Sequence, residues 1–502
     1  MTSLVAPLTG LLLAFAPACQ SPDSILLRVL TTNDFHGALL PGVQSWSNGR
    51  EVGGAAAIAG MMDRLARECG CPTIRVDAGD VMQGTPASNL TFGRATVVAF
   101  NAMGYAAAAI GNHEFDWTVD TLQARMREAR FAWLAANIRT TTGARPEWAV
   151  PWRMVRAGPL RVGVVGAASV ITPTVTRPAY VAGLRFDGAA AAVDSAVLAA
   201  RRDSADLVVV LSHDGGFCDQ QQACHGEVVD LARALTQRPD LIVSGHTHSL
   251  VNTVVNGIPV VQARSGGTAI GVVDFVAGPG GTRAARSRIE TVWADRESPD
   301  TAVQRLVAEF ERSVEPLTSR PVATLSEPLV RRGDQYPLGY LIADAYRDAA
   351  RADVAIVNNG GIRADLPAGR VTWGEVFQVL PFQNYITRVS VTGAVLQRAV
   401  VHAVGARQAQ AHVAGIRVVF GRDGALREIR LADGRPVRDE ASYTLAVPDY
   451  LAGGGSGFAM LRSREAVNTG VVDVDALVAY LRGRPQPVRA PGDVRVIRDE
   501  PR

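Results

Sequence analysis

The first half of the chain repeats one pattern, and this pattern limits the fold more than any other feature. A short, mostly β-branched apolar run is followed by a polar loop and then by a stretch with helical spacing. Because strands that alternate with helices build layered sheets, the repeat predicts a layered α/β domain. In such domains functional groups gather on the loops beyond the strand ends. The six runs are ILLRVL (25–30), PTIRV (72–76), YAAAAI (105–110), LRVGVVGA (160–167), DLVVVL (206–211) and DLIV (240–243).

A second domain is expected after a helical connector. The segment 298–317 has amphipathic spacing, with Ser298 or Asp300 as candidate cap and Pro299 in the first turn. Beyond it, helical and strand-like stretches alternate again, for example LGYLIADAYRDAARA and VAIVNN. We therefore predict a mixed α/β chain with a first domain at 25–295, a linker helix at 298–317 and a second α/β domain at 320–500.

The N-terminal segment is typical of an export signal. Residues 1–19 read MTSLVAPLTGLLLAFAPAC, with an apolar core that is too short to span a bilayer and small residues after it. The usual basic n-region is absent. We predict a signal peptide, with acylation of Cys19 as an alternative fate, so that membrane attachment is expected only if Cys19 carries a lipid. A periplasmic or cell-envelope location follows.

Charge and cysteine content narrow the function classes. The net charge of +3 over 502 residues gives no argument for a nucleic-acid polymer as partner. Five cysteines are present, and four remain when Cys19 is set aside. An even number in an exported chain favours disulfides. We predict a bond between Cys218 and Cys224, whereas one between Cys69 and Cys71 would be strained by their close spacing.

Five of the eight histidines fall in the loops after the apolar runs. Any single histidine is better explained as an ordinary hydrogen-bonded side chain, but five in matching loops are not. Imidazole and carboxylate groups are ligands for zinc, manganese and similar ions. The loop residues that point to a metal site are Asp34, His36, Asp80, Asn112, His113, His213, His246 and His248.

These loops also carry a family resemblance. In order, NDFHG, DAGD, GNHEFD, SHDGG and SGHTH resemble the motifs of the calcineurin-like metallophosphatases. The downstream half resembles the C-terminal domain of the exported 5′-nucleotidases and UDP-sugar hydrolases. The resemblance covers nearly the whole chain after the signal segment. It implies a first domain built as a β-sandwich flanked by helices, and a second domain that binds nucleotides.

The resemblance implies two adjacent divalent ions, zinc, manganese or similar. Some nucleotidases of this branch carry Gln at the position of His248, and both side chains can ligate. Asp77 is expected to order its loop. One ion would be held by Asp34, His36 and His248, the other by Asn112, His213 and His246, with Asp80 bridging the two.

The resemblance also assigns a catalytic pair. His113 would face the phosphate and be oriented by Asp116, so that His113 stabilises the transition state or assists the leaving oxygen. The alternative for Asp116 is that it caps the next helix. Bound metal would supply hydroxide at neutral pH and neutralise the charge of the phosphate ester.

In the second domain the resemblance implies a nucleotide pocket. By composition alone, VNNGGIRADLPAG, LPFQN and VPDYLAGGGSGF are a turn, a loop and a linker. The resemblance assigns phosphate binding to two arginines, nucleoside contacts to two asparagines and a base sandwich to two aromatic rings. These residues are Arg332, Arg363, Asn358, Asn384, Phe382 and Tyr450.

Two positions depart from the family pattern, and they weaken the case for an unmodified nucleoside monophosphate as the preferred substrate. Ser456 replaces an Asp that holds ribose hydroxyls in the family, and Pro337 replaces an Asn. We predict an exported phosphohydrolase of nucleotide catabolism that releases nucleoside and phosphate, with UDP-sugars and cyclic nucleotides as further substrates. The alternatives are a thiosulfohydrolase or another phosphodiesterase, and a non-catalytic nucleotide-binding protein. Metal identity, preferred base and oligomeric state stay open.

Overall fold

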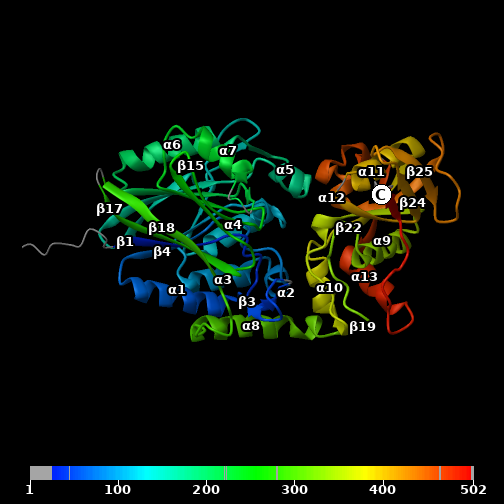
Figure 1. The fold of residues 1–502 in the computed structure, drawn as a ribbon, viewed down its shortest axis with the longest axis horizontal. Coiled ribbons are helices and arrows are strands. Elements are labelled where there is room, and N and C mark those ends of the chain that lie inside the picture. Colours follow the sequence, from blue (N-terminus) through cyan, green and yellow to red (C-terminus); the bar gives the residue numbers. More distant parts are fainter. Residues whose placement is uncertain are drawn as a thin grey trace, which may run out of the picture.

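The computed structural model describes residues 25–498, except Ser45, Gln220, Gln222, Pro279, Gly280, Arg407, Ser463 and Arg464. The predicted signal segment 1–19, with Cys19, lies outside the described residues. The chain forms two lobes, the first blue to green and the second yellow to red (Figure 1). The long helix α8 (Thr301–Thr318) runs beneath the first lobe towards the second.

The first lobe is a sandwich of two six-stranded sheets. Leu27 and Val29 of β1 share one buried cluster with Val209 and Leu211 of β11, so the two sheets pack face to face. In spatial order the first sheet contains β18 (Gly281–Thr291), β17 (Ala269–Gly278), β1 (Ile25–Thr32), β4 (Thr73–Asp77), β5 (Ala107–Ala109) and β6 (Ala132–Leu134). The second contains β15 (Leu250–Val255), β16 (Ile258–Ala263), β14 (Leu241–Ser244), β11 (Leu207–Ser212), β9 (Leu160–Ala167) and β8 (Trp152–Ala157).

Helices cover both outer faces of the sandwich. The helices α1 (Ala55–Cys69), α3 (Arg94–Met103) and α8 pack on the first sheet. The helices α6 (Ala189–Arg202) and α7 (Glu227–Ala234) pack on the second. The predicted layered α/β fold, a β-sandwich flanked by helices, is confirmed.

The connector helix begins at Thr301 because Asp300 caps it. The Asp300 carboxylate accepts hydrogen bonds from the backbone N–H groups of Ala302 and Val303. Pro299 therefore lies before the cap rather than in the first turn. Val303 and Val307 are buried against the first lobe, which anchors most of the connector to that lobe.

The second lobe is built on a five-stranded sheet with a core on each face. The helices α9 (Pro337–Ala350), α10 (Trp373–Val379) and α13 (Asp473–Arg482) cover one face, and α11 (Gly393–Val404) covers the other. In spatial order the strands are β23 (Ala411–Ala414), β20 (Val354–Asn358), β26 (Ser442–Pro448), β22 (Tyr385–Thr392) and β27 (Ala466–Val472).

Smaller strand groups complete the second lobe. A three-stranded sheet, β25 (Leu426–Leu431), β24 (Ile416–Phe420) and β28 (Val496–Arg498), joins the core on the α11 side. The strand β19 (Pro321–Leu325) follows α8 and pairs with β21 (Gly369–Thr372).

Across the described part of the chain, no helix has both the length and the apolar character needed to cross a bilayer.

Two disulfides lie in the first lobe. Cys218 is bonded to Cys224 across a short hairpin. Cys69 is also bonded to Cys71, a pair that the sequence argument disfavoured. Gly70 between them has a φ of 62°, so the chain turns sharply after α1 and the two Cα atoms come within 5.0 Å.

Candidate active site

Five loops meet at one edge of the sandwich, each following the carboxyl end of a strand. Asp34 and His36 follow β1, and Asp80 follows β4. Asn112 and His113 follow β5, while His213 follows β11. His246 and His248 follow β14. Because β1, β4 and β5 run parallel, as do β11 and β14, their loops converge on one point.

The backbone at this point is held in a conformation that side chains rarely adopt. Asp34, His36, Asp80, His246 and His248 all have φ between 49° and 74°. Each such residue costs on the order of 1–3 kcal/mol, and such strain concentrates at functional sites. Five strained residues in three converging loops are therefore independent evidence that this edge is the functional centre.

The candidate ligands form two adjoining groups. In the first, the His248 Nε2 atom lies 3.5 Å from Asp34 Oδ1 and 3.0 Å from His36 Nε2. In the second, Asp80 Oδ2 lies 3.0 Å from His213 Nε2. The Asn112 Oδ1 atom lies 3.1 Å from His246 Nδ1. Asp80 Oδ2 is also 4.0 Å from His36 Nε2, so this carboxylate stands between the two groups.

The ring orientation of two of these histidines fits a divalent metal. The Nδ1 atoms of His36 and His213 contact the carbonyl oxygens of Gln83 and Ala78, each at 2.8 Å. This orients both Nε2 lone pairs towards the cluster, as in known metal sites. Burial lowers the pKa of His36 to about 3 and that of His246 to about 4, which favours the neutral form that ligates metals. At His213 burial is outweighed by the carboxylates of Asp80 and Asp34, which raise the pKa to about 10.

A buried carboxylate that the sequence argument did not single out joins two of the loops. Glu114 accepts hydrogen bonds from the N–H groups of Asp80 at 2.9 Å, Val81 at 2.8 Å and Gly111 at 2.7 Å. The only sequence signal for this role was its place inside GNHEFD. Asp77 accepts from Gly79 N–H, so it orders its own loop.

His113 and Asp116 form a hydrogen-bonded pair at the edge of the cluster. His113 Nδ1 is 2.7 Å from Asp116 Oδ2, and His113 Nε2 is 3.9 Å from Asp80 Oδ2. Burial lowers the pKa of His113, but the carboxylates of Asp116 and Asp80 raise it more, so the net shift is upward. The ring therefore turns its Nδ1 atom to Asp116 and its Nε2 atom to the candidate metal ligands.

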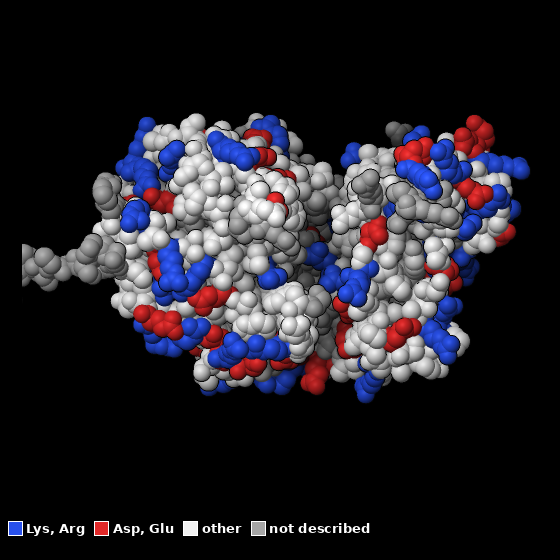
Figure 2. All heavy atoms as spheres, viewed as in Figure 1, with Lys and Arg blue, Asp and Glu red and all other residues white. Residues whose placement is uncertain are grey.

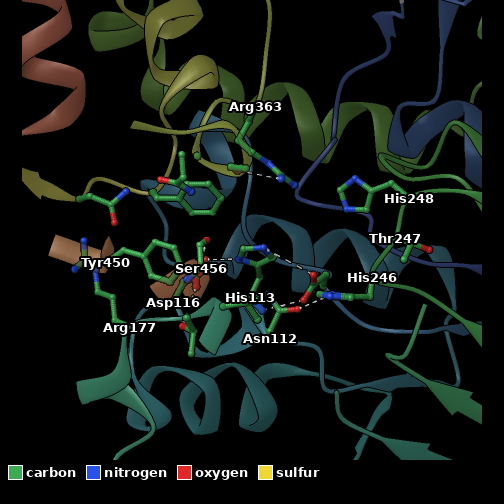
Figure 3. A pocket seen from close by; sticks show the side chains of 18 residues that line it. Asn112, His113, Asp116, Arg177, His246, Thr247, His248, Arg363, Tyr450 and Ser456 are labelled. Carbon is green, nitrogen blue, oxygen red and sulfur yellow. Dashed lines mark hydrogen bonds and ion pairs between the residues drawn. The ribbon is translucent and has the colours of Figure 1, made fainter. Parts of the chain in front are cut away.

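A cavity of about 300 Å³ begins at this cluster and extends between the two lobes. Figure 2 shows the lobes meeting along a groove, with basic side chains near its middle. In Figure 3, His246, Thr247 and His248 lie at one end of the cavity, Tyr450 and Arg177 lie at the other, and His113 stands between them. One wall therefore comes from each lobe.

Five of the six predicted substrate residues line this cavity: Asn358, Arg363, Phe382, Asn384 and Tyr450. The structure does not bring Arg332 to it. The Arg332 side chain is exposed, whereas Arg331 bonds to Asp365 and to the Ile362 carbonyl oxygen next to Arg363. The sequence pattern could not tell which of the neighbours Arg331 and Arg332 faces the site, because the direction of each side chain depends on how the loop folds.

One aromatic ring of the second lobe contacts the His113–Asp116 pair. The Phe382 ring stacks on the His113 ring at 5.3 Å between centroids, with 20° between the planes. The Arg363 guanidinium lies 5.6 Å from the Phe382 centroid. The Asn384 side chain is held by Asp473, to which its Nδ2 atom donates at 3.1 Å.

The two departures noted in the sequence have different places. Ser456 lines the cavity, and its backbone N–H donates to the Tyr450 hydroxyl at 3.0 Å. Pro337 opens α9 at its first position, where a proline fits well, and it is absent from the cavity lining. Sequence reasoning also missed Val175, Thr176, Arg177 and Thr247, which line the cavity from the first lobe.

Two family models match the chain. Residues 27–250 match the calcineurin-like phosphoesterase model. Residues 321–463 match the model of the 5′-nucleotidase C-terminal domain. The first match contains the convergent loops, and the second contains all of the predicted residues of the second lobe.

Relatives and solved structures agree with these matches. A 5′-nucleotidase of Vibrio cholerae is 28% identical, over 95% of this chain and 94% of its own length. The endonuclease YhcR of Bacillus subtilis is 27% identical over 93% of this chain, which spans only 40% of that relative's length. The crystal structure of a 5′-nucleotidase precursor from Thermus thermophilus superposes with a TM-score of 0.83 at 27% identity, covering 95% of this chain and all of that one.

Proposed function

Because the chain belongs to the family that joins a calcineurin-like phosphoesterase domain to a 5′-nucleotidase C-terminal domain, we propose that it hydrolyses nucleotides to nucleoside and phosphate. The observation that carries this proposal is the single cavity that joins the ligand cluster to Phe382, Asn384 and Tyr450. A phosphate ester placed at the cluster would have its base beside these side chains. The enzyme is therefore a phosphoester hydrolase whose second lobe selects the substrate.

We propose that the cluster holds two divalent ions. Asp34, His36 and His248 would bind one ion, Asn112, His213 and His246 the other, and Asp80 both. Bound ions would polarise the phosphate and lower the pKa of a water from about 15.7 to about 7. Elemental analysis after reconstitution should find about two ions per chain, and a value near zero would contradict the site.

The side chains of this protein supply the remaining steps. His113 would donate its Nε2 proton to the charge that develops on the phosphate or on the leaving oxygen, while Asp116 holds the ring in place. Arg363 offers a planar cation for a phosphate oxygen. Phe382 and Tyr450 would hold the base by stacking.

Hydrolysis of a substrate panel tests the proposal, measured as phosphate release for the monoesters, as sulfate release for the thiosulfate ester and by separation of the products for the other compounds. AMP, UMP, UDP-glucose, a cyclic nucleotide, an aryl phosphate and a thiosulfate ester should be compared at equal concentrations. We expect kcat/KM to be highest for a compound with a base. Hydrolysis of the thiosulfate ester alone would favour the thiosulfohydrolase alternative, and no hydrolysis by the metal-loaded protein would favour a binding protein.

We also propose that the enzyme acts outside the cytoplasm. Two disulfides in the first lobe support this location, since such bonds persist in oxidising compartments. Peptide mapping of protein from its native host should find Cys218 and Cys224 oxidised. Free thiols at both positions would count against export.

A further inference from the structure

One segment of the first lobe connects the two ends of the cavity. It contains α5 (Thr172–Val175) and the turn Pro178–Tyr180 between β9 and β10 (Leu184–Phe186). Val175, Thr176 and Arg177 from this segment line the cavity. Figure 3 places Arg177 beside Tyr450, at the end away from His246 and His248.

Arg177 contacts both segments of the second lobe that carry aromatic rings. Its Nη2 atom donates to the Gln383 carbonyl oxygen at 2.8 Å. Gln383 lies between Phe382 and Asn384 and has a φ of 53°, a conformation that favours glycine. The Arg177 Nε atom lies 3.7 Å from Asp449 Oδ2, and Asp449 directly precedes Tyr450.

Other contacts of the same segment also join the two lobes or reach Asp116. The Tyr450 hydroxyl donates to the Thr174 carbonyl oxygen at 2.6 Å. The Thr176 hydroxyl donates to Asp116 Oδ1 at 3.3 Å, so the segment also contacts the partner of His113. Arg177 Nη1 donates to the Tyr180 hydroxyl at 2.9 Å, which fixes the guanidinium on its own lobe.

We infer that Arg177 is a positioning residue that determines substrate specificity. It holds the segment Phe382–Asn384 and the segment around Tyr450 in place relative to the proposed catalytic pair, His113 and Asp116. Among the described residues, its hydrogen bonds and ion pair go to Tyr180, Gln383 and Asp449, none of which is a candidate metal ligand. Its guanidinium instead bridges the lobes at the two places where a base would be bound. Recognition of the base then depends on a residue of the phosphoesterase lobe. This inference rests on the proposed nucleotide substrate.

The test compares two substrates on matched variants. Wild-type enzyme is first assayed with AMP and with glycerol phosphate, which has no base. In Arg177→Gln we expect kcat/KM for AMP to fall by about 10- to 100-fold, as for the loss of a charged hydrogen bond. This decrease should come mainly from a higher KM for AMP. The fold decrease in kcat/KM should be at least five times larger for AMP than for glycerol phosphate. Arg177→Lys keeps the charge and one donor, so it should recover part of the loss.

Controls separate this role from a folding defect. Arg185→Gln removes an exposed arginine of the same lobe that pairs with Asp187, and it should leave both substrates within about twofold of wild type. Asp449→Asn should lower AMP hydrolysis, and its combination with Arg177→Gln should lose less than the sum of the two single effects on a free-energy scale.

The outcomes are distinguishable. If wild type does not prefer AMP over glycerol phosphate, the proposed nucleotide function fails. If wild type prefers AMP but Arg177→Gln loses equally on both substrates, or on neither, only the inference about Arg177 is overturned. Additive losses in the double variant would likewise overturn the bridge between Arg177 and Asp449.

Discussion

The two ends of the cavity are built differently. At the metal end every candidate ligand comes from one lobe, and the loops are tied to one another by Glu114 and by backbone hydrogen bonds. At the end where the base would bind, Phe382 and Tyr450 belong to the second lobe. Phe382 stacks on His113, and the segments that carry the two rings contact Arg177 and Thr174. One end is thus preorganised within a domain, while the other exists only while two domains are in contact.

This difference teaches where each property of the enzyme resides. Chemistry that needs exact geometry is placed on short loops after buried strands, where strain in five backbone positions can be sustained. Under the proposed function, recognition of the base lies between the lobes and depends on the hydrogen bonds that join them. Substitutions at the metal end should therefore affect all substrates, and those at the base end should affect nucleotides selectively.

The largest effect should come from Asp80→Ala. Because Asp80 stands between the two ligand groups, its loss should release both ions and lower turnover by about 10³-fold or more for every substrate. Elemental analysis and phosphate release measure the two effects. Asp187→Ala, which removes a partly exposed carboxylate that pairs with Arg185, serves as the control. An Asp80→Ala protein with full metal content would show that Asp80 is not the bridge.

His113→Ala should come next and should separate catalysis from metal binding. We expect both ions to remain and turnover to fall by roughly 10²- to 10⁴-fold, the range for a general acid–base group. The loss should be similar for AMP and glycerol phosphate, since His113 belongs to the metal end. Loss of metal would instead make His113 a ligand, and unchanged turnover would remove it from the mechanism.

Phe382→Ala should produce a smaller and selective effect. Stacking on a base is worth about 1–3 kcal/mol, so kcat/KM for a nucleotide should fall by about 5- to 150-fold. Hydrolysis of glycerol phosphate should fall much less. Since Phe382 also stacks on His113, equal losses for both substrates would show that this ring serves the catalytic histidine rather than the base.

The smallest effect is expected for Arg332→Gln. Its side chain is exposed and absent from the cavity lining, so both substrates should stay within about twofold of wild type. Arg363→Gln is the matched comparison, because Arg363 lines the cavity and should lose far more. A large loss in Arg332→Gln would mean that the lobes close further than in this structure.

The order of motifs along the sequence was enough to predict the layered fold and the convergence of the loops. Strand ends are visible in sequence because apolar β-branched runs stop abruptly, and parallel strands then bring their following loops together. The same logic placed Asp34, Asp80 and His213 near one another. It could not find Glu114, since one buried carboxylate within a motif looks like any other acidic residue.

The amino-acid sequence by itself determined the strand-and-loop order, the residue types at the metal end and the aromatic and amide groups at the base end. Only the tertiary structure decided that Arg177 bridges the lobes, that Arg332 is exposed outside the cavity lining and that Cys69 bonds to Cys71. The physical reason is distance along the chain. Local pattern governs strands and the loops that follow them, whereas contacts such as that of Arg177 with Gln383 join residues more than 200 positions apart and depend on how two domains pack.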